Sequence, residues 1–420
     1  MSVSDRSAGG AVGTDPPPPA GSLREEGGRW RVRPTAAAPR GGGATLSRVP
    51  IPPFTASHDG LRREIREFIR SEVRPHADEW ERDRWFPDEL FGWFAQRGYL
   101  GLKYPRSHGG AGGDYLDDAV LAEELAGCAS GGVAAGIGAH IGIATPPIWK
   151  FGSDQQKRDY LEPAIRGERI AALAITEPDA GSDVASIRTF AREVDGGFLV
   201  NGAKLYITNG VRADFLVTAV KTSGEGGHHG LSFLIIERGQ GVRSTKLDKL
   251  GWHASDTAEI AFEDAEVPAE NLLGERDRGF YLIMANFQWE RLLMALGSVA
   301  GMQAGFELTL ELVGSRSVGQ TTRHALAEVA TTIEVGRALT YHALRLFHAG
   351  IDAVAEVTMA KLATQRAACD TAARCLEIVG LDPGTDTHLL ERHLRDARLG
   401  PIGGGTDEIM KEILGKTLGL

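Results

Sequence analysis

One carboxylate stands in an apolar setting where it could act as a base. Glu290 is at helical spacing from Ile283, Phe287 and Met294, so all four are expected on one face of a helix. An ionisable group there is costly unless it is paired or used, and burial raises a carboxyl pKa toward the range of a general base. The alternative is a structural ion pair with Arg291, although neighbours i and i+1 point about 100° apart on a helix. These residues alone leave both interpretations open.

A second candidate site is the stretch 174–183, which reads Ala-Ile-Thr-Glu-Pro-Asp-Ala-Gly-Ser-Asp. Pro178 restricts one φ angle, and Gly181 permits close approach of the backbone. Thr176 and Ser182 offer short polar groups to a backbone or to a ligand. This composition suits either a ligand-facing loop or a tight turn with a helix cap.

Composition narrows the class of protein. The 420 residues are 42% hydrophobic and 24% charged, as in a large globular chain. The net charge of −10 argues against nucleic acid as a partner. The three cysteines, Cys128, Cys369 and Cys375, show no metal spacing and predict a reducing compartment. We therefore expect no metal site and a cytoplasmic location.

The chain divides into four stretches. Residues 1–54 are rich in Gly, Pro, Ala and Arg without an apolar signal segment, and they predict a disordered tail; an organellar transit peptide is the less favoured alternative. Residues 55–170 carry helical apolar patterns, 171–275 carry strand patterns, and 276–420 are helical again. Without βαβ alternation, this order predicts an α+β fold with a small middle sheet domain.

Particular elements within these stretches can be assigned. Helices are expected near 61–73, 90–94, 115–125, 132–143 and 154–165, then at 279–306, 323–349, 352–379 and 406–418. Asn201-Gly202 predicts a two-residue hairpin between strands at 198–200 and 205–207, followed by strands at 215–220, 231–236 and 259–262.

Three other readings of the sequence fail. Gly136-Ile137-Gly138 has Ile141 where a dinucleotide-binding fingerprint needs its third glycine. The stretch 197–204 lacks the Gly-Lys pair of a phosphate loop, because Ala203 separates the two residues. The stretch 279–306 is long and apolar, but its central Glu290 and Arg291 argue against a membrane span and for a core helix of a four-helix bundle.

Lys204-Leu205-Tyr206-Ile207-Thr208-Asn209-Gly210 follows the 174–183 stretch. Together the two resemble the acyl-CoA dehydrogenase family, whose flavin lies between a Thr-Glu-Pro-x-Ala-Gly-Ser-Asp loop and an aromatic-Ile-Thr strand. The resemblance continues, in family order, through 256–259, 267–274, Glu290-Arg291-Leu292 and 404–409. It implies an N-terminal α-helical domain, a middle β-barrel-like domain and a C-terminal four-helix bundle.

The resemblance also assigns the base. Many members carry the catalytic glutamate just before Gly-Thr in the C-terminal loop, where this chain has Gly404. Isovaleryl-CoA and long-chain acyl-CoA dehydrogenases place it on the long bundle helix beside an arginine, which Glu290-Arg291 matches. Glu290 is thus expected to remove the α-proton of an acyl thioester while the β-hydrogen passes as hydride to flavin N5, giving a 2-enoyl thioester.

The other roles are carried over residue by residue. The resemblance implies that Thr176 and Thr208 contact the ring of an FAD, that Ser182 contacts its pyrophosphate, and that Tyr206 packs on it. Arg291 resembles the arginine near the phosphate or adenine end of acyl-CoA. The loop of Gly403 and Gly404 is expected to bind the thioester oxygen through a backbone N–H, with the flavin ribityl chain as the second donor. Because these glycines lack side chains, we also expect room for a short, branched or bulky acyl chain, carried on coenzyme A or on a carrier protein.

Two departures concern the assembly. The family's Arg-x-x-Phe-Gly reads Ser315-Arg316-Ser317-Val318-Gly319, so Arg316 is shifted by one position. The family's Gln-x-x-Gly-Gly-x-Gly reads Glu-Ile-Val-Gly-Leu-Asp-Pro at 377–383. In the family these regions hold the ADP half of a flavin bound mainly to a neighbouring subunit. A homo-oligomer and a mixed oligomer with a related subunit are both consistent with this pattern, and the resemblance implies electron-transfer flavoprotein or a similar acceptor.

Two alternative functions remain at this point. One is a flavin-dependent oxygenase on the same fold, which would need no base for an α-proton. The other is a non-catalytic or half-site subunit of a mixed complex.

Overall fold

The computed structural model describes residues 23–26, 29–32, 53–224, 227–314, 318–381 and 389–420. It has two compact units, Met1–Pro50 and Ile51–Leu420. In the first unit, β1 (Leu23–Glu26) and β2 (Arg29–Val32) pair antiparallel, a hairpin that the composition of the tail did not predict. The end of the predicted tail, residues 53–54, belongs to the second unit, where the Phe54 ring packs edge-to-face on Tyr341 with centroids 5.3 Å apart. The other residues of the predicted tail lie outside the described residues.

The second unit begins with helices. Buried Phe68, Phe91, Val120 and Ile137 from four of these helices share one core, as their helical spacing predicts. The first helix continues as a π-helical turn that ends before Pro75, whose ring cannot extend it. The helices are α1 (Ala56–Phe68), α2 (Ala77–Asp83), α3 (Glu89–Gln96), α4 (Tyr115–Glu124), α5 (Gly131–Ala139), α6 (Thr145–Phe151), α7 (Asp154–Gln156) and α8 (Glu162–Ile165).

A sheet of eight strands follows. Hydrogen bonding gives the order β10-β7-β6-β4-β5-β9-β8, and β3 pairs with β6. The strands are β3 (Ala171–Ala174), β4 (Phe190–Val194), β5 (Gly197–Ile207), β6 (Phe215–Lys221), β7 (Leu231–Glu237), β8 (Val242–Lys246), β9 (Ala258–Pro268) and β10 (Leu272–Leu273).

The two faces of this sheet have different partners. Phe215 and Phe233 on one face pack with Tyr160 from the N-terminal helices and with Leu282 from the helix that follows the sheet. Side chains on the other face, from β5, β6, β7 and β9, pack on one another. The sheet therefore curls around a core of its own, while its first face joins the helices.

The predicted hairpin at Asn201-Gly202 is wrong. β5 runs unbroken through both residues, and the turn that joins it to β4 lies at 195–196. Asn201 Nδ2 instead donates to Asp264 Oδ1 across the sheet at 2.8 Å, where the register of β5 against β9 shifts. Gly202 has a φ of 146°, and a Cβ added there would lie 2.6 Å from Thr189 Cα. The glycine serves a β-bulge with a close strand approach, which shares its sequence signature with a turn.

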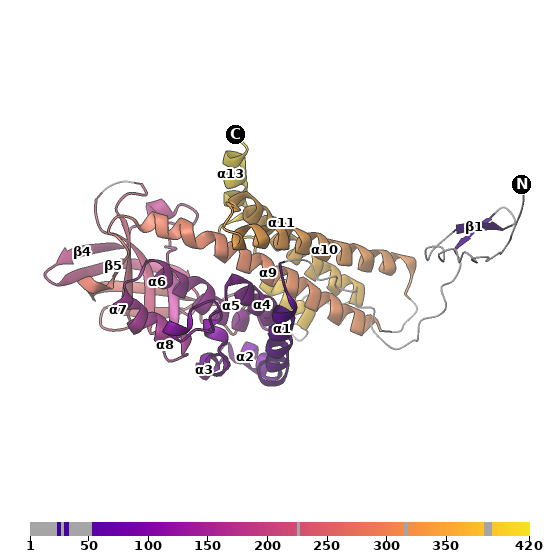
Figure 1. Ribbon diagram of the computed structural model, residues 1–420, viewed down its shortest axis with the longest axis horizontal. Coiled ribbons are helices and arrows are strands. Elements are labelled where there is room, and N and C mark those ends of the chain that lie inside the picture. Colours follow the sequence, from indigo (N-terminus) through magenta and orange to yellow (C-terminus); the bar gives the residue numbers. More distant parts are fainter. Residues whose placement is uncertain (1–22, 27–28, 33–52, 225–226, 315–317, 382–388) are drawn as a thin grey trace, which may run out of the picture. The chain divides into compact units, whose positions relative to one another are not determined.

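Helices return after the sheet: α9 (Gly279–Val313), α10 (Gln320–His348), α11 (Val354–Val379), α12 (Leu389–Ala397) and α13 (Asp407–Thr417). The three long helices pack together, and α12 and α13 pack on α11. Figure 1 shows α9 running from beside the sheet into this bundle. The α+β class and the helical, sheet, helical order are confirmed, whereas α12 was not predicted.

α9 is long and apolar enough to cross a membrane by length and composition alone. Its central Glu290 and Arg291 are ionisable, and its sides pack against α4, α10 and α11. These contacts are those of a core helix in a bundle.

Candidate active site

The carboxyl group of Glu290 is buried on α9. Ile283 is buried and Phe287 and Met294 are half-buried around it, in the predicted stripe. Glu290 Oε2 is inaccessible and has no hydrogen-bond partner among the residues that the structure describes. Desolvation raises the pKa of Glu290 to about 7, although the positive charges of Arg291 and Lys361 oppose this rise. The group is therefore poised to accept a proton near neutral pH.

Arg291 does not neutralise Glu290 by a direct ion pair within the described chain. Its guanidinium is buried, lies 5.2 Å from the Phe287 ring centroid, and its Nε is 3.4 Å from the carbonyl oxygen of Gly404, to which it donates. The structural ion pair considered from the sequence is therefore not formed. The structure places Arg291 at the C-terminal loop, and its role toward the phosphate end of a thioester stays a prediction.

The two positions that the resemblance offers for a base meet in space. A Cβ added to Gly404 would lie 3.6 Å from Glu290 Oε1 and 2.4 Å from Met294 Sδ. A carboxylate on either element would thus face the same space, and this chain supplies it from the helix. Met294 also fills the volume beside Gly404 and lies 3.7 Å from a Cβ added to Gly403. Met294 thus takes the place that a side chain at Gly404 would occupy, and the preference for short, branched or bulky chains stays a prediction.

In the described part of the chain, the loop 403–405 leaves two backbone donors without a protein acceptor, the N–H groups of Gly404 and Gly405. The N–H of Gly403 donates to the Leu399 carbonyl at 2.9 Å, so it is already used. Gly404 and Gly405 have φ angles of 61° and 96°, which only glycine adopts readily. Within the described part of the chain, no protein acceptor takes the Gly404 N–H. Of the two substrate-binding glycines that we predicted, Gly404 is therefore the one with a free donor beside Glu290.

Sequence reasoning missed Lys361 on α11. Its ammonium group is fully buried and donates to the Gly405 carbonyl at 2.5 Å. Burial lowers the pKa of Lys361 to about 8, Arg291 lowers it further, and Asp407 and Glu290 oppose them. A signal was available, because Lys361 follows buried Val357 by four residues on one helical face, the pattern that singled out Glu290.

A buried ion pair ties the predicted flavin loop to the sheet. Lys204 Nζ donates to Glu177 Oε1 at 2.8 Å and to the Ile175 carbonyl at 2.9 Å. Glu177 Oε1 also accepts from the Thr189 N–H at 2.9 Å. Burial lowers the pKa of Lys204 to about 8, with Glu177 opposing. These contacts fix the backbone on both sides of Thr176.

The residues assigned to the flavin come from the 174–183 loop and from the end of β5, which a backbone hydrogen bond joins. The Leu205 N–H donates to the Thr176 carbonyl at 2.8 Å, which sets the loop beside the end of β5. Thr176 and Thr208 are half-buried, and Ser182 is exposed. Tyr206 is 67% exposed at a second register shift of β5, with a φ of 61°. An exposed aromatic ring on a strained bulge beside short polar groups fits a surface that a flat cofactor covers.

The other predicted half of the flavin site is not described. Arg316 lies outside the described residues, as do Asp382 and Pro383 of the 377–383 stretch. The described part of that stretch ends α11 at Gly380, which has a left-handed φ of 78°.

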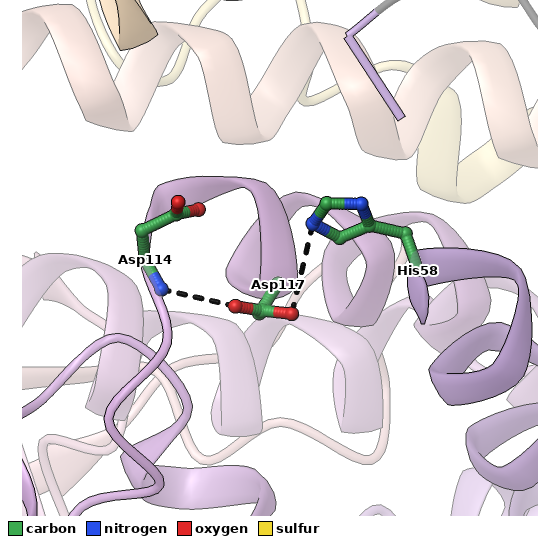
Figure 2. Close-up of side chains that lie close together, drawn as sticks. All are labelled: His58, Asp114 and Asp117. Atoms are coloured by element: carbon green, nitrogen blue, oxygen red, sulfur yellow. Dashed lines mark hydrogen bonds and ion pairs between the residues drawn. The ribbon is translucent and has the colours of Figure 1, made fainter. Parts of the chain in front are cut away.

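One cluster has the residue types of a metal site. Figure 2 shows His58, Asp114 and Asp117, which come from the starts of α1 and α4. Their atoms are engaged in helix capping: His58 Nδ1 accepts from the Thr55 N–H at 3.0 Å, and Asp117 Oδ2 accepts from the Asp114 N–H at 3.0 Å. His58 Nε2 then carries the proton and faces Asp117 Oδ1 at 3.8 Å. Capping accounts for this cluster without an ion.

Family models match nearly all of the second unit. The acyl-CoA dehydrogenase N-terminal, middle and C-terminal domains match residues 55–168, 172–265 and 277–419. The chain belongs to the acyl-CoA dehydrogenase family. It is 36% identical over 376 residues to the mitochondrial long-chain specific acyl-CoA dehydrogenase of Sus scrofa, covering 87% of each chain. It is 34% identical to the mitochondrial isovaleryl-CoA dehydrogenase of Solanum tuberosum, over 87% of this chain and 91% of the relative.

Solved structures agree. An acyl-CoA dehydrogenase from Geobacillus kaustophilus superposes with a TM-score of 0.84 at 36% identity, over 88% of this chain and all of the other. An FAD complex of PigA gives 0.83 at 28% identity, over 87% and 98%. A structure of the electron transferring flavoprotein of Acidaminococcus fermentans contains a chain that gives 0.82 at 30% identity, over 87% of this chain and 98% of that chain. The fold, the FAD cofactor and the class of acyl-CoA dehydrogenase, an oxidoreductase, are thereby confirmed.

Proposed function

We propose that this acyl-CoA dehydrogenase oxidises an acyl thioester to the 2-enoyl thioester with Glu290 as the base for the α-proton. The observation that carries the proposal is the buried, unpartnered carboxyl of Glu290, whose pKa is raised to about 7, beside the free N–H of Gly404. A base with such a pKa is present in its reactive form at neutral pH and still holds a proton well.

The residues of this chain divide the reaction between them. Glu290 takes the proton from the α-carbon. The electron pair of the broken C–H bond then forms the double bond between the α- and β-carbons, as the β-hydrogen leaves as a hydride. FAD, when bound, would supply the hydride acceptor, and Thr176, Ser182, Tyr206 and Thr208 would hold it. The N–H of Gly404 donates to the thioester oxygen, where negative charge develops as the α-proton leaves.

Two alternative functions make different demands on the site. A flavin-dependent oxygenase would have no use for a base of raised pKa at the position of Glu290. A non-catalytic subunit would have no reason to keep that carboxyl unpaired in an apolar slot at the cost of desolvation. Retention of Glu290 therefore favours the dehydrogenase.

The partners follow from the same proposal. The reduced enzyme passes its electrons to electron-transfer flavoprotein or a similar acceptor.

The assembly is a homo-oligomer, on the general ground that most soluble oligomers are homomeric, with a mixed oligomer as the alternative. A cytoplasmic location is supported by the three cysteines, which are all unpaired.

A thioester panel tests the function. Flavin-loaded protein is mixed with straight-chain and branched acyl-CoA and acyl-carrier-protein thioesters, and reduction of an artificial electron acceptor, oxygen uptake and products are followed. We expect acceptor-dependent formation of the enoyl thioester. Oxygen consumption that inserts an oxygen atom into the product would instead establish the oxygenase, and the chain length that reacts fastest defines the acyl group.

A further inference from the structure

Two buried cations hold the loop that faces the base. Gly404 and Gly405 are consecutive, and each gives its carbonyl oxygen to a different cationic side chain: Gly404 to Arg291 of α9 at 3.4 Å, and Gly405 to Lys361 of α11 at 2.5 Å. A lysine that is fully removed from water pays a large desolvation cost, and one carbonyl hydrogen bond does not offset it by itself. The position of Lys361 therefore calls for an explanation beyond packing.

The loop gives that explanation. Its two glycines have φ angles of 61° and 96°, so the peptide units there have many competing orientations when unbound. The hydrogen bond from Lys361 of α11 fixes the Gly405 carbonyl, and the contact from Arg291 of α9 fixes the Gly404 carbonyl. Within the described part of the chain, the Gly404 N–H takes no acceptor. We propose that Lys361 is a positioning residue, which locks the 403–405 loop so that the Gly404 N–H meets the thioester oxygen while the Glu290 carboxylate meets the adjacent α-carbon of the same substrate.

The positive charge of Lys361 also supports the proposed role of Glu290. The groups that face Lys361 are Glu290 and Arg291 from α9 and Asp407 and Glu408 from α13. Asp407 already has a partner, because its Oδ2 accepts from Arg366 Nε at 2.5 Å. Lys361 is thus one of two cations whose positive charge favours the ionised form of Glu290. Its loss should disturb both the geometry of the loop and the ionisation of the base.

This inference rests on the proposed role of Glu290, and the test separates the two. The variants are Lys361→Met, which keeps the length of the side chain, Lys361→Arg, which keeps the charge, and Glu290→Gln. The matched control is Lys411→Met on α13, an exposed lysine 3.8 Å from Glu408. Flavin-loaded proteins are compared by visible spectrum, kcat, KM and the pH dependence of kcat.

We expect Lys361→Met to lower kcat roughly 10- to 100-fold, the effect of losing a hydrogen bond to a charged group, with a smaller change in KM. Its kcat should also begin to rise only at a higher pH than in the parent, because Glu290 has lost a neighbouring positive charge. Lys361→Arg should recover much of kcat and the parental pH profile, and Lys411→Met should match the parent.

Two results would overturn the inference. One is a Lys361→Met enzyme with parental kcat and pH profile. The other is equal loss in Lys361→Met and Lys361→Arg with no shift of the pH profile, which would indicate packing alone. Either result, together with an inactive Glu290→Gln enzyme, leaves the proposed function standing. An active Glu290→Gln enzyme would remove the base assignment itself, whatever the lysine variants do.

Discussion

The ionisation of Glu290 is the residue-scale property on which the proposed chemistry depends. Its folded pKa is about 7, well above the ordinary 4.5 of a glutamate, because burial disfavours the charge. The reactive carboxylate is therefore the minor form below neutral pH and the major form above it. We expect the rate constant for flavin reduction by a thioester to rise with pH through about 7 and then level off.

Stopped-flow reduction across a pH series measures this profile directly. A reduction rate that is flat across the neutral range would contradict the assignment.

The raised pKa of Glu290 also affects stability, because the folded state binds the proton more tightly than the unfolded state. The stabilising contribution of protonated Glu290 is fully present below the unfolded pKa, and it is lost as pH rises through the folded pKa.

Only some of the residues around Glu290 could be predicted from residue types and their spacing in the sequence. The apolar stripe around Glu290 was readable because helical periodicity is local. The helical position of Lys361 was readable in the same way, but its hydrogen bond to the Gly405 carbonyl and the packing of Met294 beside Gly404 were not, because they depend on how the helices and the loop meet. Such packing between distant segments cannot be inferred from local sequence patterns.

At the scale of elements, the buried pair Lys204–Glu177 joins the 174–183 loop, predicted to bind flavin, to β5. Replacing Lys204 by Met would leave the Glu177 carboxylate buried without a cation. We expect the free energy of unfolding to fall by about 3–5 kcal/mol and FAD to bind more weakly, because the backbone around Thr176 loses its tether. Denaturant unfolding and FAD titration measure the two effects.

The double variant Lys204→Met with Glu177→Gln is the control for that prediction. It removes the unpaired charge while it keeps the amide as an acceptor for the Thr189 N–H, so much of the stability should return. If the single variant is as stable as the parent, the pair does not anchor the loop.

The strands show where a local signal and the fold disagree. Asn201-Gly202 has a strong hairpin signature, yet it forms a bulge inside β5. The turn lies instead at Asp195-Gly196, which has the same chemistry six residues earlier. Both sites permit a turn, and the pairing of β5 with β9 over its whole length decides between them.

At the scale of the whole molecule, the first question is what the N-terminal tail contributes. Met1–Pro50 forms a compact unit separate from Ile51–Leu420. Its composition gives it few apolar side chains to contribute to the core of the second unit. We expect removal of residues 1–50 to change the free energy of unfolding by less than about 1 kcal/mol and to leave kcat unchanged. Thermal unfolding of the shortened chain checks this, and a large fall in melting temperature would show that the tail docks.

The assembly is the second property at this scale. The near half of the predicted flavin site keeps the residue types that the family motif requires, Thr176, Ser182, Tyr206 and Thr208, while the sequence around Arg316 and 377–383 departs from the family pattern. We expect the chain purified alone to form a homo-oligomer with about one flavin per subunit. The visible spectrum and the mass of the purified protein decide this. A colourless protein that gains flavin and activity only when co-expressed with a related chain would establish the mixed assembly.

The central claim is that Glu290 removes the α-proton, and anaerobic rapid mixing of Glu290→Gln with the fastest thioester tests it most directly. The amide keeps the size of the side chain but cannot act as a base. We predict a fall in the rate of flavin bleaching of roughly 100-fold or more, while FAD content and thioester binding stay parental. Glu307→Gln, an exposed glutamate on the same helix, should bleach at the parental rate. If Glu290→Gln bleaches as fast as the parent, another group is the base.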